Sequence, residues 1–561
     1  MKTTAGINKN VARREKVRII LLTISFTIIA IIGFGFWYWD TNKNVIIEKE
    51  LEKAFTKSNK GFYKISYDAM KVDEETGSLL VSNMKLSYDS FTFREKKPSM
   101  LFTIQIPEIS VVGVKTKKAL LDKEIVGRKL EIKNPVVDLA YTYKGKDSIR
   151  NVPTEEIYRE VLGNLDIIQI DSVLITNAHI RTSNKKTGKV IIDVEDVDLS
   201  LLDLRVDSLS VNDSSRFLFS RSMTINVAKI ALPSPDKLYD YQAEGIVLSS
   251  GAGNLLIDRI SVIPRLGEEE FVNAIPTQAD RLSFFFNDVA VAAVDIQKLP
   301  DDYIKAGTMT IGRSSVKIYR DLARPRDRRN RVGLYPHQVM DDIPLRFNIT
   351  RVNIQNSFIE YKERNHITRQ SGKVRFYNVN GTITNFTNDK STANKVMKAV
   401  VNSSFLNKTP LKTNWTFYLF HPNGRFDVAG TLGSLDGQAL NALAEPMGPA
   451  RIEEGRFNGM TFNLQGNDHS MDGSVKMLYE NLDIAILEKD KGATETDKKF
   501  LTSLIANVAI KNSNPNGDDE VRVQQVHLSR DINRSLFNLC WKTIFKGIQG
   551  TVGIKKASAA N

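Results

Sequence analysis

The chain has very little cysteine: Cys540 is the only one among its 561 residues, so no disulfide can form within one molecule. A body of this size must then be held together by packing and hydrogen bonding. Histidine is also scarce. The six histidines are scattered, and no two of them stand at the spacing of metal ligands. We therefore expect no metal site.

The sequence motifs of common catalytic sites are missing too. The chain contains no Gly-x-Ser-x-Gly, no His-Glu-x-x-His and no phosphate-loop motif. The glycine-containing stretch at residues 245–253 lacks the lysine and the following helix of a phosphate loop, so we interpret it as a strand and a turn. We expect neither an enzyme nor a bound cofactor.

Long hydrophobic runs are limited to one, at residues 19–39, which holds 21 residues without a charge. At about 1.5 Å per residue it is long enough to cross a bilayer as a helix. We expect this anchor to contact lipid through Ile19, Leu22, Phe26, Ile31, Phe36, Trp37 and Trp39. A cleaved signal peptide is the alternative, but its apolar region spans only about 7–15 residues and ends at small residues rather than aromatic ones. A buried core helix fits less well, because no polar face is visible.

The charges around this run give its orientation. Residues 1–18 are rich in lysine and arginine, which stay on the cytoplasmic side of a membrane. We therefore expect a cytoplasmic tail at 1–18, an anchor at 19–39, a stalk helix at 40–60 and an exported body beyond. The net charge of +13 favours anionic partners such as lipid headgroups. Export makes nucleic acid a poor candidate.

From residue 62 onward, apolar and polar residues alternate, as in Leu282, Phe284 and Phe286, which is the pattern of half-buried strands. The phase of this alternation slips by one residue between Leu201 and Leu202, which predicts a β-bulge there. Short helices are expected at 117–123, 154–162 and 436–444. The chain is therefore predicted to be mainly β.

A weak internal repeat supports this interpretation. The pattern apolar-x-apolar-x-Asn/Arg-x-x-apolar occurs at residues 130–139, 173–180, 309–318 and 352–361. It predicts a strand, a turn or bulge at the asparagine, and a second strand, because asparagine tolerates the left-handed backbone conformation. Chance recurrence in a β-rich chain is the alternative. We favour repeat-like growth of one extended sheet.

The chain ends with a helix candidate at residues 532–548. Its apolar side could dock on the end of the sheet as a cap, or it could lie on a membrane or a partner protein. Cys540 lies within it and is interpreted as a small apolar residue rather than a reactive thiol.

Three stretches besides the anchor carry a resemblance to a known family: EIKNPVVDL at 131–139, a Gly-x-Leu…Leu-Asn run at 430–441, and DGSVKMLYENLDIAIL at 472–487. On these, the chain resembles the AsmA-like family of bacterial envelope proteins, which includes bridge-like lipid-transfer proteins of the TamB type. The resemblance implies a single-pass anchor in the bacterial inner membrane, a periplasmic body, and a long, strongly curved antiparallel sheet with a taco-like apolar groove. It also implies phospholipid as cargo.

We therefore expect an extended β-sheet body at 61–430, an AsmA-like C-terminal β region at 431–530, and a terminal amphipathic helix and tail at 531–561. The candidate groove residues are Ile132, Ile175, Phe284, Ile311 and Ile354. An ordinary β-sandwich or barrel, whose apolar faces cover each other, remains an alternative.

One loop is unusually basic, with six arginines in residues 320–331. Arginine matches phosphate oxygens in a bidentate way, so the loop could meet lipid headgroups or an acidic partner; a solvated loop is the alternative. The candidates are Arg324, Arg326, Arg328, Arg329 and Arg331.

Taken together, the sequence predicts an inner-membrane-anchored periplasmic protein that aids phospholipid transport between membranes or outer-membrane homeostasis. The C-terminal helix could then meet the outer membrane or one of its proteins. The alternative is a non-enzymatic envelope assembly or scaffold factor that binds proteins rather than lipid.

Overall fold

The computed structural model describes residues 63–73, 75–88, 100–115, 124–141, 166–188, 190–210, 213–366, 369–447, 450–486 and 511–553. The expected anchor at 19–39, the stalk at 40–60 and the short helices at 117–123 and 154–162 lie outside these residues. Within the described ranges, no helix is both long and apolar enough to cross a membrane.

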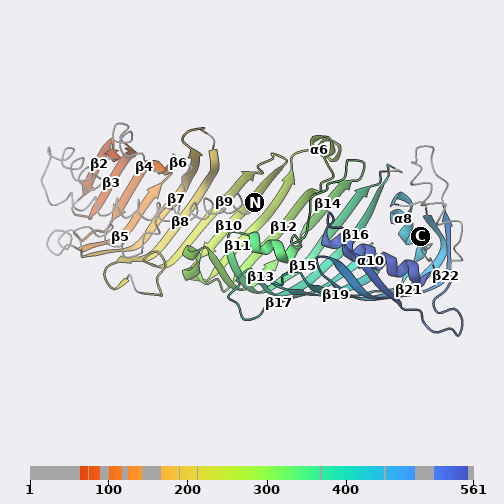
Figure 1. Ribbon diagram of the computed structural model, residues 1–561. Coiled ribbons are helices and arrows are strands. Elements are labelled where there is room, and N and C mark those ends of the chain that lie inside the picture. Colours follow the sequence, from red (N-terminus) through yellow and green to blue (C-terminus); the bar gives the residue numbers. More distant parts are fainter. Residues whose placement is uncertain are drawn as a thin grey trace. The chain divides into compact units, whose positions relative to one another are not determined.

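The fold is mainly β, with a long antiparallel sheet (Figure 1). Two compact units make up the chain. Among the described residues, the first holds those up to Leu232 with Tyr241–Arg259 and Ala290–Tyr303, and the second holds Pro233–Asp240, Ile260–Val289 and those from Ile304 on.

The strands up to β11 are β1 (Tyr63–Ser66), β2 (Ala69–Asp73), β3 (Ser78–Tyr88), β4 (Met100–Val112), β5 (Glu124–Lys133), β6 (Val136–Tyr141), β7 (Ile167–Asn184), β8 (Val190–Val206), β9 (Ser220–Pro233), β10 (Tyr239–Ser249) and β11 (Asn254–Pro264). The later strands are β12 (Arg281–Ala292), β13 (Tyr303–Ile311), β14 (Ser315–Asp321), β15 (Arg346–Arg364), β16 (Ser371–Thr387), β17 (Val396–Phe405), β18 (Thr409–Tyr418), β19 (Phe426–Leu432), β20 (Leu435–Asp436), β21 (Ala450–Gly466), β22 (Ser470–Ile486) and β23 (Gln524–Ser529). The helices are α6 (Glu268–Ala274), η3 (Ile296–Asp301), α7 (Pro336–Val339), η4 (Met340–Asp342), η5 (Gly437–Leu440), α8 (Asn441–Met447) and α10 (Leu536–Thr551).

Three predictions of local structure are confirmed. The stretch at 245–253 forms the end of β10 and the turn before β11, as expected of a strand and a turn. The helix expected at 436–444 is present as η5 and α8, and the terminal helix is present as α10. The sequence analysis did not predict α6 and α7.

In the first unit, apolar side chains form continuous rows across neighbouring strands. Strand β3 pairs with β4, and β4 pairs with both β5 and β6. Both β5 and β6 run parallel to β7, which pairs with β8, and β8 pairs with β9. Facing residues form one row of Val81, Ile109, Ile132, Ile175, Leu199 and Ile225, and a second row of Leu79, Val111, Leu130, Val173, Leu201 and Met223. All members from β3 to β8 are buried.

The phase slip in β8 is real but differs in detail from the prediction. Leu201 and Leu204 are buried, Leu202 is 48% exposed, and Asp203 between them has a left-handed backbone with φ 51°. The pairing of β8 with β7 keeps the same register on both sides of this slip, because the alternation of buried and exposed residues in β7 shifts at the same level. The two strands therefore step together, and neither gains an unmatched residue as it would in a bulge.

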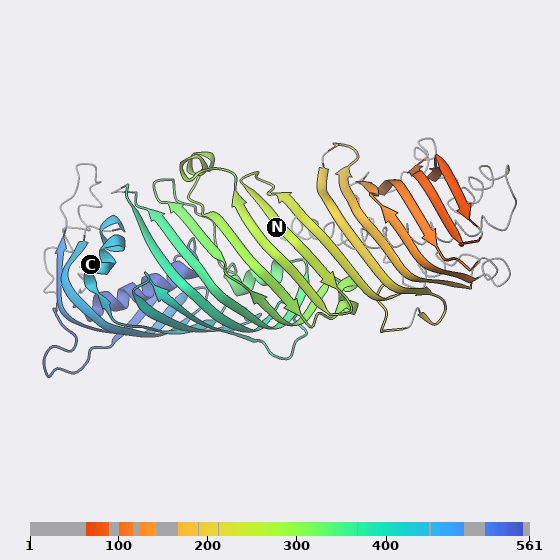
Figure 2. The same ribbon diagram turned by 180° about the vertical axis from the view of Figure 1, so that it is seen from behind.

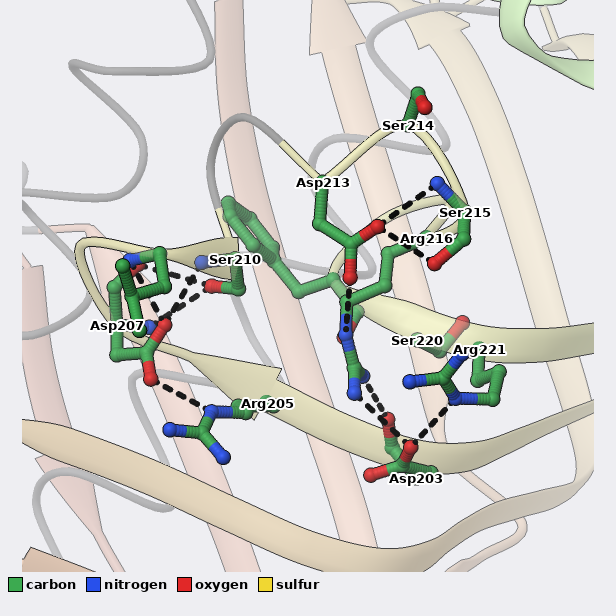
Figure 3. A network of polar contacts seen from close by, with 12 residues as sticks. Asp203, Arg205, Asp207, Ser210, Asp213, Ser214, Ser215, Arg216, Ser220 and Arg221 are labelled. Carbon is green, nitrogen blue, oxygen red and sulfur yellow. Dashed lines mark hydrogen bonds and ion pairs between the residues drawn. The ribbon is translucent and has the colours of Figure 1, made fainter.

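Ion pairs hold this step and the turn that follows it (Figure 3). The Asp203 carboxylate accepts hydrogen bonds from the guanidinium groups of Arg216, at 2.9 Å, and Arg221, at 3.0 Å. Burial raises the pKa of Asp203, but the two arginines outweigh it and keep the pKa below its ordinary value. The carboxylate stays charged, and it fixes β8 against the start of β9.

The two units repeat the same arrangement. In the first, β5 and β6 both pair with β7 and run parallel to it. In the second, β13 and β14 both pair with β15, and β14 runs parallel to it. Ile311 lies 179 residues after Ile132 in the chain, and Ile354 lies 179 residues after Ile175. The repeat inferred from sequence is therefore a structural duplication.

The asparagines of that repeat have the conformation that was predicted. Asn134, Asn177 and Asn356 have φ of 50°, 53° and 46°. The side chain of Asn177 donates to Asn134 Oδ1 at 2.7 Å, so the irregular positions on neighbouring strands line up. Such lines of irregular backbone let a wide sheet bend.

Candidate functional site: an apolar sheet face with a strap and a helix

The second unit carries one apolar face, here called the inner face, which is defined by three rows of facing residues. The rows are Phe284, Val316, Ile359, Phe376 and Phe405; Val352, Ile383, Ala399, Trp415, Val428, Leu464, Gly473 and Val526; and Met397, Phe417, Phe426, Gly466, Met471 and Leu528. The face thus extends over the paired strands from β12 to β23.

Two glycines of β19 and β21 make room for aromatic rings of the neighbouring strand. A Cβ atom on Gly430 would lie 2.2 Å from the Phe462 ring, and one on Gly466 would lie 2.4 Å from the Phe426 ring. Each ring therefore lies flat over a glycine of the neighbouring strand, a known way to fill a twisted sheet.

The inner face is partly exposed at one end and covered at the other. Phe284, Ile318, Ile359 and Ile383, on β12 and β14–β16, keep part of their surface exposed. On β19–β23 the corresponding residues are buried in a cluster with α10, as Phe426 and Leu464 are. Apolar surface of the inner face is therefore partly exposed on β12 and β14–β16, whereas on β19–β23 the helix α10 packs against it.

The helix α10 covers the part of the inner face that β19–β23 form (Figures 1 and 2). Ser535 caps its start by accepting a hydrogen bond from the backbone N–H of Asn538. Leu539 and Cys540 pack on the inner face, and Gly547 lies so close that a Cβ would meet Val475 at 2.5 Å. The helix therefore docks on the sheet, as the first of its two expected roles requires, and contact of the same helix with a membrane or a partner protein stays a prediction.

Cys540 behaves as the sequence predicted. It is buried, and burial raises the pKa of its thiol to about 12. A thiol with that pKa is almost never ionised near neutral pH, so it packs as a small apolar group.

The other side of α10 presents aromatic residues to solvent. Phe537, Trp541 and Phe545 recur every fourth residue and are 46%, 40% and 46% exposed. Trp541 stacks on Phe545, with ring centroids 6.1 Å apart, and Phe537 meets Tyr361 of β15 at 5.8 Å. We call these three residues the aromatic stripe.

A second covering element, here called the strap, is the connection between β14 and β15 at residues 322–345. Its Tyr335 is fully buried against Phe426, with ring centroids 5.5 Å apart, and the Tyr335 hydroxyl donates to the carbonyl of Asn467. Asn467 lies in the turn between β21 and β22. The strap therefore crosses the inner face from β14 to that turn.

His337 of the strap is 3% exposed and lies among aromatic rings, 5.0 Å from Phe417 and 6.1 Å from Tyr335 between centroids. Burial lowers the pKa of His337 to about 4, against a weaker opposite effect of Asp468. The imidazole is therefore neutral at neutral pH, and it packs as an aromatic ring.

The strap and the start of α10 meet at a buried ion pair. Arg530 and Asp468 are 2.6 Å apart, and the Arg530 guanidinium lies 4.1 Å from the Tyr335 ring. Asp468 also accepts from the amide of Gln338 and the backbone N–H of Gly333. This pair joins the β21–β22 turn, the strap and the segment before α10.

The basic loop predicted to meet headgroups is largely paired within the protein. Arg324 donates to the Val272 carbonyl and the Asn273 side chain. Arg326 pairs with Asp531, and Asp327 holds both Arg329 and Arg331 at 2.9 Å. Arg328 is exposed, and its carbonyl accepts from Asn533. The side chain of Arg326 therefore joins the loop to the segment before α10, that of Arg324 joins it to α6, and Arg329 and Arg331 are held within the loop.

The five predicted groove residues are divided between the two units. Ile132 and Ile175 face each other in the first unit and are buried. Phe284, Ile311 and Ile354 belong to the second unit and are partly exposed. The second group lies on β12, β13 and β15. Phe284 belongs to the first row of the inner face, and Ile354 stands two residues after Val352 of the second row.

One cluster could hold a metal ion, although the sequence predicted none. His179, Asp193 and Glu195 bring ligand atoms within 4.8 Å of one another, because β7 and β8 pair antiparallel. The His179 ring already contacts Asp193 at 2.5 Å, and Arg181 lies 3.7 Å from that carboxylate. The cluster is a surface ion-pair group, and no cofactor chemistry follows from it.

The sequence analysis missed Tyr335, His337, Asp468 and Arg530, whose roles depend on contacts distant in the chain. One signal was available: the alternating charges of SRDINRS at residues 529–535 directly precede the terminal helix. No protein-family model matches the chain, and no curated protein is significantly similar to it in sequence.

Proposed function

We propose that this chain is an envelope protein, anchored in the inner membrane by residues 19–39, that holds phospholipid acyl chains on the open end of its inner face. In this role it aids phospholipid transport between membranes or outer-membrane homeostasis. The observation that carries the proposal is the partly exposed apolar surface of β12–β16, which ends where α10 and the strap begin.

Acyl chains fit this surface on energetic grounds. Each methylene group moved from water onto apolar surface contributes about 0.8 kcal/mol. A chain of ordinary length therefore gains on the order of 10 kcal/mol before the costs of ordering it. The rows of isoleucine, valine and phenylalanine offer contact along a line, which suits a long flexible chain.

Two further features support the proposal. The apolar run at 19–39 would hold the body beside a lipid source, and the resemblance to AsmA-like proteins points to phospholipid as cargo. Helix α10 and the strap would end the lipid-binding surface, because their packing covers the sheet from β19 to β23.

The proposal is tested by charging the inner face. Ile354→Glu places a carboxylate among apolar residues of β15, whereas Val400→Glu changes a residue of β17 that is 40% exposed and pairs with Thr382 on the other face. We expect full-length Ile354→Glu to co-purify with at least fivefold less phospholipid per protein than wild type. Val400→Glu should match wild type. Equal lipid content in all three proteins contradicts the proposal and favours a scaffold that binds proteins.

A further inference from the structure

A small pocket lies at the start of α10, between this helix and the end of β23. Its volume is about 70 Å³, and it is lined by Leu528, Ser529, Arg530, Asp531, Arg534, Ser535, Asn538, Leu539 and Lys542. On the same measure one water molecule needs about 10–15 Å³. The pocket therefore has room for roughly five heavy atoms, as many as a phosphate group contains.

The charges around the pocket are unbalanced. Three cationic side chains line it, against the single carboxylate of Asp531. Asp531 pairs with Arg326, and Arg530 pairs with Asp468. Arg534 also lies 4.0 Å from the Asp531 carboxylate, and it donates a hydrogen bond to Gln278 Oε1 at 3.1 Å. The one carboxylate of the pocket is therefore shared by two arginines, and the exposed Lys542 adds a further positive charge.

Arg534 shows that the local potential is positive. Burial, and then the neighbouring charges of Arg320 and Arg326, lower the pKa of its guanidinium. These effects outweigh the opposite influence of Asp531 and Glu363. An anion in the pocket would relieve this repulsion, because it adds the negative charge that the cluster lacks.

We propose that this pocket binds the phosphate group of a phospholipid through Arg534, Lys542 and Asn538. The guanidinium of Arg534 and the ammonium of Lys542 supply charged donors, and Asn538 supplies a neutral amide. The N-terminal end of a 16-residue helix adds a favourable dipole for an anion. The inference rests on the proposed function, because it adds a binding site for the headgroup of the phospholipid that the protein is proposed to hold.

The aromatic stripe favours a lipid over free phosphate. Asn538 and Lys542 follow Phe537 and Trp541 directly in the helix, so the pocket and the stripe occupy adjoining sides of α10. A phosphate ester seated in the pocket can therefore lay its apolar substituent over exposed aromatic rings. Inorganic phosphate gains nothing from that surface.

The site differs from the loop that the sequence analysis singled out. Four arginines of that loop already contact protein groups: Arg324, Arg326, Arg329 and Arg331. Arg326 instead pairs with Asp531, which belongs to the segment that carries Arg534.

The test uses the full-length protein and two probes, inorganic phosphate and a short-chain phosphatidylglycerol below its micelle concentration. Binding is followed by phosphorus NMR line broadening and by the emission of Trp541. Lys542→Gln is the diagnostic variant, because Lys542 is exposed and its change leaves packing intact. Lys546→Gln, one turn further along and outside the pocket lining, is the matched control.

We expect both probes to bind, with the lipid tighter, and Lys542→Gln to weaken both at least tenfold. Lys546→Gln should bind as wild type does. Equal binding by Lys542→Gln, or no binding of either probe, overturns the pocket, whereas the phospholipid content of Ile354→Glu judges the proposed function separately. Binding of inorganic phosphate without the short-chain lipid overturns the assignment to a phospholipid.

Discussion

Asp468 and Arg530 form an ion pair 2.6 Å long whose side chains are 2% and 1% exposed. Asp468 lies in the turn between β21 and β22, and Arg530 lies between β23 and α10, so this pair joins the last hairpin to the terminal helix. A buried charge that loses its partner is left uncompensated, which typically costs about 3–5 kcal/mol.

We therefore predict that Arg530→Met lowers the free energy of unfolding of the second unit by about 3–5 kcal/mol. Adding Asp468→Asn to that variant should recover part of the loss, since it removes the orphaned charge. Denaturant unfolding followed by tryptophan fluorescence measures both. As a control, Arg329→Met breaks a pair whose arginine is 74% exposed, and it should change stability by less than about 0.5 kcal/mol.

Lowering the pH should destabilise the packing of the strap on the inner face, because His337 becomes protonated. The folded protein holds the pKa of His337 near 4, below its ordinary value of 6.5. The unfolded chain therefore binds more protons between these values, so this contribution to stability is complete above pH 6.5 and is lost as the pH falls towards 4. The loss amounts to about 3 kcal/mol at most.

Replacement with phenylalanine tests this pH dependence, because the ring remains and the titration disappears. We expect His337→Phe to lose distinctly less stability than wild type between pH 6.5 and pH 4.5, in thermal unfolding at each pH. Other carboxylates titrate in both proteins and cancel in the comparison. Parallel curves for the two proteins would mean that His337 is not buried in its neutral form.

The close packing of α10 on the sheet depends on Gly547. A Cβ at this position would lie 2.5 Å from Val475, so Gly547→Ala should push the helix from the sheet and cost about 1–3 kcal/mol. At Gly550 the added Cβ meets only the Gln524 side chain, which can move. Gly550→Ala should be neutral or slightly stabilising, because alanine favours helix. Limited proteolysis of α10 and thermal unfolding distinguish the two variants.

The left-handed asparagines give a fourth prediction. Asn356→Gly should be tolerated, because glycine adopts φ of 46° without strain, whereas Asn356→Val should cost about 1–2 kcal/mol or more. Asn353, three residues earlier on β15, has no such conformation, and Asn353→Val should fold nearly as wild type does. Equal loss at both positions, read from chemical denaturation, would show that the repeat does not depend on this backbone geometry.

Much of the β architecture follows from local pattern. Alternation in residues such as Leu282, Phe284 and Phe286 predicts strands, and Asn134, Asn177 and Asn356 predict the irregular positions, because both depend only on neighbours in the chain. The duplication could also be predicted, since Ile132 and Ile311 stand in the same pattern. Each of these features is encoded within about ten residues.

The covering of the inner face could not be predicted in this way. Tyr335 and Asn467 are joined by a hydrogen bond across 132 residues, and Arg326 and Asp531 pair across 205 residues. An arginine-rich loop looks the same in sequence whether it faces a headgroup or a buried carboxylate. Only the register of the sheet decides between these roles, and the register depends on the whole fold.

The central claim is that phospholipid lies on the inner face. A photo-crosslinking residue placed at Ile354 of the full-length protein in cells tests it most directly, with Val400 as the outward-facing control. The account predicts phospholipid adducts at Ile354, detected by mass spectrometry, and at least fivefold fewer at Val400. Equal yields at the two positions, or adducts to protein alone at Ile354, would contradict it.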